Sequence, residues 1–300
     1  MKPIRPIALA AVGLGLAWGP GAGALSAQET LEIHRAVPAD AYLKVWGGGG
    51  TVEIRGWEHD SLAVTGRIRS GPGRFFHRVE GGVGKLGLEV DPKRAGEVDA
   101  VISVKLPATS TLWVKVAGAH VDARGLTGTL DVHAVSGSVQ VTGSPEALTV
   151  ESMAGELSLD LDAAGVVRAK GGEADVRVAG DVLDLTATAV GGDVLVDLDS
   201  ARRAELETID GRIAWRGGLE RGGWLSARTH SADVELVLPA GLGPELDLAT
   251  VEGEIESEIG ATPATGGAFP GVRLVDEAGA GSATVEVRTF SGTIRVRRGR

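Results

Sequence analysis

The sequence predicts an all-β fold, a β-solenoid of about 18–21-residue coils with an N-terminal β cap, and three observations support this. A short phrase recurs, in which a small residue, two variable residues, Gly or Ala and one variable residue precede Val, Ile or Leu. The phrase returns at a nearly constant step, and a fixed period of this kind indicates a repeat architecture. Apolar and polar residues alternate on both sides of it, with no 3.6-residue apolar period, which is typical of short strands.

The copies of the phrase keep a close register. They lie at Ala134–Val139, Ser152–Leu157, Gly171–Val176, Ala189–Val194, Thr208–Ile213, Thr229–Val234, Thr250–Ile255 and Thr289–Ile294. From Val139 the closing apolar residues follow one another at steps of 18, 19, 18, 19, 21, 21 and 39 residues. The last step is about two repeats long, and its Gly/Ala/Pro/Thr-rich stretch near 261–281 is expected to be a loop or a degenerate coil.

The residue two before the end of each phrase is expected to form a tight turn. Only Gly or Ala lets the backbone bend so closely without a side-chain clash. The predicted structural turn glycines are Gly137, Gly155, Gly192, Gly211, Gly253 and Gly292. A unit of 18 residues is too small to bury its own apolar face, so stacked units bury it jointly. An antiparallel β-sandwich with short hairpins is the rival fold, because it also has regular turns.

The chain divides into three predicted parts. Residues 1–27 have the pattern of a secretory signal peptide, with Lys2, Arg5, an apolar run and the small-residue segment "GAGALSAQ". An uncleaved membrane anchor is the alternative, although the apolar run is short for a full span. Residues 28–106 are expected to form the N-terminal β cap or early coils, and residues 107–300 the repetitive β-solenoid.

Composition narrows the possible functions. The formal net charge is −10 and only the tail "RVRRGR" is strongly basic, which argues against nucleic-acid binding. There are no cysteines, so disulfides, thiolate metal sites and cysteine nucleophiles are excluded. We expect an exported protein, in a periplasm or at the cell surface or secreted, with no transmembrane segment in its mature chain.

The repeats also resemble a known family. The stretches "VKLPATSTLWVKVAGAHVDARGLTGTLDVHAVSGSVQVTG", "LETIDGRIAW", "LATVEGEIES" and "VRTFSGTIRV" are similar to the bacterial putative adhesin domain family of unknown function. That family is marked by repeated S/T-x-S/D-G-x-I/V-x-V phrases on a β-helix-like fold. The resemblance covers about residues 100–300. It implies export and a surface role, and it carries over no catalytic residues.

Two rows of acidic residues are candidate sites. Asp162, Asp181 and Asp199 stand five residues after successive phrase ends, so stacking would bring their carboxylates close together. Such carboxylates repel one another, and Ca²⁺ with its preference for oxygen ligands would relieve that repulsion. The alternative to a calcium site is that these aspartates lie on a solvated turn edge. A second row stands one residue before the phrase end and is interrupted by Arg212; it is expected to be a solvated face. Its members are Glu156, Asp175, Asp193, Asp233 and Glu254.

Taken together, these features predict a non-enzymatic exported protein, an adhesin or a cell-envelope binding or structural protein that presents a repetitive surface. Its partner would be a cell-envelope polymer, a surface protein or another copy of the chain, and no cofactor is expected apart from the possible calcium. A periplasmic envelope-stress scaffold or sensor accessory is the alternative. A polysaccharide-active enzyme is a third possibility, but aromatic sugar platforms are scarce and Trp215 is expected in the core. The threonines that open the later phrases are expected to hydrogen-bond between coils.

Overall fold

The computed structural model describes residues 29–260, 262–265, 270–277 and 282–299, so the predicted signal peptide lies outside the described residues. Strands make up 68% of the structure, and one 3-10 helix, η1 (Pro92–Glu97), is the only helical element in the described part. The strands are β1 (Thr30–Ala36), β2 (Tyr42–Trp57), β3 (Ser61–Ser70), β4 (Arg74–Glu80), β5 (Val83–Glu89), β6 (Asp99–Pro107), β7 (Thr111–Leu126), β8 (Thr129–Ala134), β9 (Ser138–Gly143), β10 (Ala147–Ser152), β11 (Glu156–Gly171), β12 (Asp175–Thr188), β13 (Val194–Leu198), β14 (Arg203–Glu207), β15 (Ile213–Gly217), β16 (Gly223–Thr229), β17 (Val234–Leu238), β18 (Glu245–Thr250), β19 (Ile255–Ser257), β20 (Ala264–Thr265), β21 (Val272–Asp276), β22 (Ala283–Thr289) and β23 (Ile294–Arg298).

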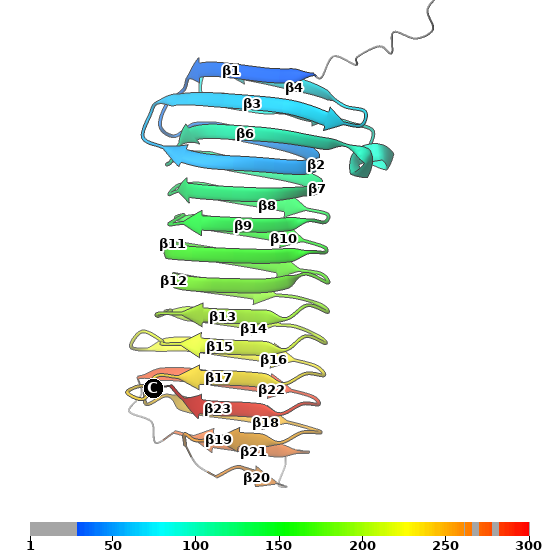
Figure 1. Ribbon diagram of the computed structural model, residues 1–300. Helices are drawn as coiled ribbons and strands as arrows, with labels where there is room; N and C mark the ends of the chain where they lie inside the picture. Colours follow the sequence, from blue (N-terminus) through cyan, green and yellow to red (C-terminus); the bar gives the residue numbers. More distant parts are fainter. Residues whose placement is uncertain (1–28, 261, 266–269, 278–281, 300) are drawn as a thin grey trace, which may run out of the picture.

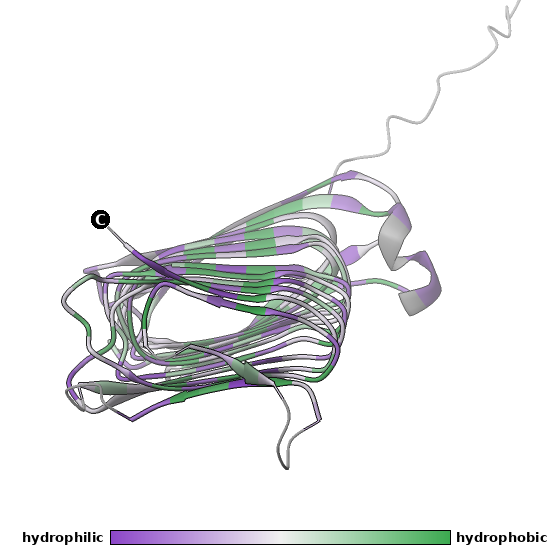
Figure 2. Cartoon of the chain, turned by 90° about the horizontal axis from the view of Figure 1, so that it is seen from below, coloured by the Kyte–Doolittle hydropathy of each residue, from purple (hydrophilic) through white to green (hydrophobic). Residues whose placement is uncertain are grey.

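The strands stack in layers, each of which places one strand on each of two opposite faces (Figure 1). Face A follows the parallel pairings β6, β2, β7, β9, β11, β12, β13, β15, β17, β23 and β19. Face B follows β5, β2, β7, β8, β10, β11, β12, β14, β16, β22 and β18. The long strands β2, β7, β11 and β12 cross from one face to the other. Seen along the stack, the chain traces a flattened ring (Figure 2).

The core lies between the two faces and is built from in-register columns of apolar side chains. Val139 pairs with Val121 on one side and with Leu157 on the other, and all three are fully buried. Trp215 is 1% exposed, as expected for a core residue, and the same layer carries the small, buried Ala204 on face B. Close packing of the interior requires such a balance of large and small side chains.

The predicted all-β content is observed, but the predicted class, a β-solenoid of about 18–21-residue coils with an N-terminal β cap, is wrong. The strands belong to one hydrogen-bonded sheet that closes into a parallel barrel with extra strands. Equivalent positions of the repeated phrase do pair across neighbouring strands, as Val176 does with Leu157 and Val194. The spacing of the repeats therefore predicts which residues pair on neighbouring strands. It carries no information on how a sheet closes or on the order of its strands in space.

Strand order departs from chain order at both ends of the stack. β2 lies between the β5–β6 layer and β7, while β22 and β23 lie between the β16–β17 layer and the β18–β19 layer. The last strands of the chain are therefore interior to the stack. Antiparallel strands extend both ends, with β3 on β6, β1 on β3, β4 on β5, β21 on β18 and β20 on β21.

An arginine–aspartate cluster holds the inserted strand β22. Asp247 on β18 accepts hydrogen bonds from Arg273 on β21, at 3.0 and 3.1 Å, and from Arg288 on β22. Burial raises the pKa of the Asp247 carboxyl, but the hydrogen bonds from the two guanidinium groups outweigh it and leave that pKa lowered. β21 falls within the stretch predicted as a loop. The predicted boundary between residues 106 and 107 stays a prediction.

The turns between the faces bring backbone of neighbouring layers very close together. A Cβ placed on Gly211 would lie 1.9 Å from the carbonyl oxygen of Gly192, and one on Gly155 would lie 2.1 Å from that of Gly137. The threonines opening the later phrases hydrogen-bond between layers, which confirms that expectation. Thr208 donates to the carbonyls of Val190 and Gly192, at 3.3 and 3.2 Å.

We predict that Gly211→Val strongly destabilises the protein, because its side chain would overlap the carbonyl of the layer above. The matched control is Gly241→Val, since nothing lies within 4 Å of a Cβ at Gly241. Thermal unfolding should show a loss of several degrees or an unfolded chain for the first variant, at a cost of roughly 3 kcal/mol or more. The control should melt like the parent. Equal melting temperatures would contradict the close approach at this turn.

Candidate functional site

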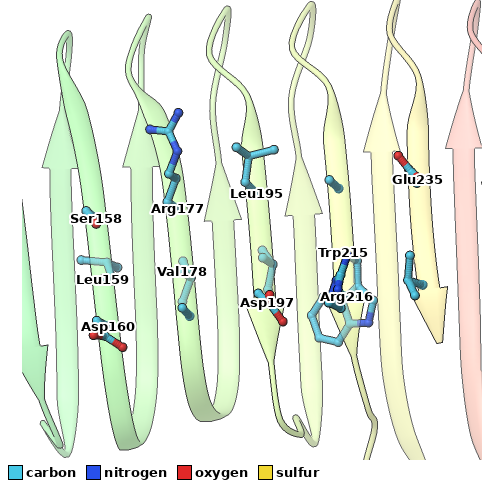
Figure 3. Close-up of a pocket in the computed structure, with 14 residues that line it drawn as sticks. Ser158, Leu159, Asp160, Arg177, Val178, Leu195, Asp197, Trp215, Arg216 and Glu235 are labelled. Carbon is cyan, nitrogen blue, oxygen red and sulfur yellow. The ribbon is translucent and has the colours of Figure 1, made fainter. Parts of the chain in front are cut away.

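An open groove runs across five strands of face A and is the candidate site (Figure 3). Its volume is about 570 Å³, in the range of small-ligand sites. The lining residues are Ser158, Leu159, Asp160, Arg177, Val178, Ala179, Leu195, Val196, Asp197, Ala214, Trp215, Arg216, Glu235 and Val237. These residues come from β11, β12, β13, β15 and β17, so only the stacking of layers brings them together.

The groove exists because small outward side chains alternate with long ones. Ala179 pairs with Asp160 on one neighbouring strand and with Asp197 on the other, so its methyl group leaves a gap between two carboxylates. Ala214 leaves a second gap beside Glu235. The residues between these outward positions point inward and are buried, including Trp215, so the floor rests on packed core. The groove is therefore set by the strand register and by the small outward side chains over a packed core.

The charged groups of the groove differ in their partners. Arg177 is held by two carboxylates, at 2.7 Å from Glu156 and 3.1 Å from Asp175. Asp160 and Asp197 are exposed, and no ion pair to either is found among the described residues. Glu235, the third acidic lining residue, pairs with Arg297 at 3.3 Å. Asp160 and Asp197 are therefore the carboxylates that the groove offers to a ligand.

The three aspartates predicted as a calcium ladder follow the face A strands of three successive layers. Asp162, Asp181 and Asp199 are all exposed. In the part of the chain that the structure describes, no group of three or more His, Asp or Glu side chains could hold a metal ion. The calcium site stays a prediction, and the described geometry adds nothing to it.

The second acidic row joins neighbouring layers. Asp175 accepts the backbone N–H of Asp193 at 3.0 Å, and Asp193 accepts that of Arg212 at 2.9 Å. Asp233 accepts the N–H of Thr293 at 2.8 Å and pairs with Arg295 at 2.8 Å. The hydrogen bond from the Thr293 backbone and then the one from the Arg295 guanidinium lower the pKa of the Asp233 carboxyl. This row is structural, not simply a solvated face as the sequence suggested.

An exposed apolar strip runs along one edge and was not predicted from the sequence. The first variable residue of several phrases is apolar, and the turns stack these residues: Ile209 donates its N–H to the carbonyl of Val190 in the adjacent layer. The strip contains Val135, Met153, Val190, Ile209 and Phe290, which are between 43% and 68% exposed. Aligning the repeats would have revealed it. Exposed apolar patches of this kind mark contact surfaces in many proteins.

An aromatic row on face B was likewise not predicted from the sequence. The ring centroids of Trp46 and Phe76 are 5.8 Å apart, those of Trp46 and Trp113 5.3 Å, and those of Trp113 and His133 5.8 Å. In sequence these residues are spread over 88 positions, from Trp46 to His133. They meet because β2 pairs with β5 and β7 out of chain order. No sequence signal indicated that they meet.

Comparisons with known proteins add little. No family model and no curated protein matches the sequence. Among solved structures, a putative cell adhesion protein from Clostridium sporogenes ATCC 15579 is 11% identical, with a TM-score of 0.24 over 90% of this chain and 100% of that one. A putative adhesin from Bacteroides fragilis NCTC 9343 is 12% identical, with a TM-score of 0.38 over 89% and 97%.

A third solved structure, a putative lipid binding protein from Parabacteroides distasonis ATCC 8503, is 11% identical, with a TM-score of 0.43 over 91% of this chain and 97% of that one. Likenesses with TM-scores this low carry no argument about function, and the family suggested by the repeats stays a prediction. Within the described residues, no helix has the length and apolar character needed to cross a membrane.

We predict that Asp233→Asn lowers the melting temperature at neutral pH by ~2–4 °C, which corresponds to about 1 kcal/mol for a half-exposed carboxylate. The folded-state pKa of Asp233 is depressed, so its contribution is present above the unfolded pKa of about 4 and is lost as pH falls through the folded value. The difference between parent and variant should therefore shrink from about pH 5 downward.

Melting curves from pH 7 to pH 3 test this prediction, in buffer with a chelator. Asp162→Asn is the control, because Asp162 is an exposed carboxylate outside the acidic row. The control should match the parent at every pH. A deficit for Asp233→Asn that is constant with pH would contradict the proposed role of its charge.

Proposed function

We propose that this chain is a non-enzymatic, exported binding protein that presents a repetitive, rigid surface, as an adhesin or a cell-envelope structural protein does. The observation that carries the proposal is the groove of face A, which is assembled from outward side chains of five stacked strands. Parallel strands repeat at about 4.8 Å, so equivalent outward positions form columns with a regular spacing.

Such columns suit a partner that is itself repetitive. Each exposed polar contact is weak, but several contacts on one rigid lattice add up without a further ordering cost. A cell-envelope polymer fits this description, and a surface protein or a second copy of the chain are the other partners. The exposed apolar strip that contains Met153 and Ile209 favours self-association as a contributing contact.

The alternatives concern location and chemistry. The proposal of export is based on Lys2, Arg5 and the apolar run that follows them. A periplasmic scaffold or sensor accessory would be exported as well. A polysaccharide-active enzyme would need an acid and a base on either side of a bond. Asp160 and Asp197 flank the gap at Ala179, and they are the pair that the enzyme alternative would use.

We predict a graded loss of binding as the groove is altered. Asp197→Asn should weaken binding to a printed array of acidic and neutral glycans by about 2–10-fold, the value of one charged contact. Asp160→Asn with Asp197→Asn should weaken it further. Glu207→Gln, an exposed carboxylate on β14 outside the groove, is the control and should bind like the parent. Turnover of an arrayed glycan that Asp197→Asn abolishes, with the fold intact, would establish the enzyme alternative instead.

We predict that an epitope-tagged copy is reached by protease on intact cells, with lysed cells as the control. Cleavage on intact cells supports an adhesin at the surface. Protection until the outer envelope is opened by osmotic shock supports the periplasmic scaffold. Recovery of the full-length tag only after cell lysis, in the cytosolic fraction, would contradict export in either form.

A further inference from the structure

Three cations stand directly beside one another at the N-terminal end of face B. Arg78 on β4 pairs in register with Lys85 on β5, and Lys85 pairs in register with Lys44 on β2. All three occupy outward positions; Arg78 and Lys85 are exposed and Lys44 is half-buried. Like charges at directly opposed positions of a sheet are destabilising. A column of three in a chain of net charge −10 therefore calls for a compensating charge.

The chain supplies only part of that compensation. Arg78 pairs with Glu80 at 3.1 Å, on the same strand. No ion pair to Lys44 or Lys85 is found among the described residues. Lys44 lies instead over two aromatic rings, 5.5 Å from the Tyr42 centroid and 5.8 Å from that of Trp113. By contrast, Arg295 lower in the stack contacts two carboxylates.

Aromatic rings border this column. Phe76 and Trp46 are paired in register with the same residue, Gly87, from opposite sides. Gly87 has φ +149°, and a Cβ there would lie 2.2 Å from the Trp46 carbonyl oxygen, so no side chain separates the two strands at this position. The Trp46 and Phe76 rings lie 5.8 Å apart beside the gap, half-buried and at fixed tilt.

A hollow lies over the cations. Its volume is about 370 Å³, and its lining residues are Tyr42, Lys44, Arg78, Glu80, Val83, Gly84 and Lys85. Three cations thus converge on an open recess that has the Tyr42 ring in its wall, and Glu80, the acidic residue of the lining, is paired with Arg78. The rings of Trp46, Phe76 and Trp113 lie outside this lining, farther along the same face. Carboxylates meet such lysines in charge-assisted hydrogen bonds, and the C–H faces of sugar rings pack on aromatic rings.

We propose that this cation–aromatic patch binds a carboxylate-bearing polysaccharide. The patch consists of Tyr42, Lys44, Trp46, Phe76, Arg78, Lys85 and Trp113. The inference rests on the proposed binding function and names its ligand class. Acidic groups along the polymer neutralise the cation column, while sugar rings pack on the half-buried aromatic rings. A membrane surface fits less well, because none of the described large apolar side chains of the patch is fully exposed, and Val83 in the lining of the hollow is the one exposed apolar side chain beside it.

The test uses the full mature chain and polygalacturonate oligomers, with their carboxyl-reduced neutral counterpart as the matched ligand. The parent should bind the acidic oligomer at least tenfold more tightly than the neutral one, with an affinity that falls as salt rises. Lys44→Gln with Lys85→Gln should lose at least tenfold. Lys105→Gln with Arg168→Gln changes the net charge equally at exposed positions outside the patch and should bind like the parent.

Stability gives a second readout that does not depend on the ligand. Removing two stacked cations relieves repulsion, so Lys44→Gln with Lys85→Gln should melt at or above the temperature of the parent. Equal loss in the patch and control variants, equal binding of the neutral oligomer, or binding confined to anionic phosphatidylglycerol vesicles would each overturn the inference. If the patch fails while the face A groove still binds an arrayed glycan, the ligand assignment falls and the proposed function stands. If both fail, the proposed function falls as well.

Discussion

The structure depends on the close, in-register approach of backbone between neighbouring layers. At the turns, the carbonyl oxygen of one layer occupies the space that a Cβ of the next would take, as at Gly192 and Gly211. This approach lets the parallel hydrogen bonds continue around both faces. It also places equivalent side chains directly above one another, inside as apolar columns and outside as polar ones. Core, surface and candidate sites all follow from it.

Because the layers stack in register, charged side chains at equivalent positions lie directly above one another in columns. A charge repeated in every layer would repel the like charges in the layers above and below. In this chain, acidic side chains pair with arginines or accept hydrogen bonds from backbone N–H groups. Asp233 does both, through Arg295 and Thr293, and Asp122 on β7 is held between Arg55 and Arg124 at 2.9 Å from each. The column of Arg78, Lys85 and Lys44 lacks this balance. That contrast is the basis on which the cation–aromatic patch is proposed as a ligand site.

The ends of the stack differ from its middle in strand direction and strand order. An open parallel edge would offer unpaired backbone groups to other chains. Antiparallel strands cover both faces at the N-terminal end and the face B edge at the C-terminal end, where β21 lies on β18. At the C-terminal end the final strands return into the stack, and Asp247 joins β18 to β21 and β22. The same out-of-order threading at the N-terminal end brings β2 between β5 and β7 and creates the aromatic row. Topology at the ends therefore makes the surface features that the repeats alone do not contain.

The sequence by itself determined the strands, the inward set of apolar residues and the close turns, because these are set by alternation and spacing within about 20 residues. The burial of Trp215 and the interlayer bonds of Thr208 follow from that register. Only the tertiary structure decided how the sheet closes and in what order its strands lie, and on this point the predicted β-solenoid class was wrong. Those features depend on contacts between segments far apart in the chain. For the same reason the gap at Ala179 and the meeting of Trp46 with Phe76 could not be predicted: local pattern carries no signal of which distant strands become neighbours.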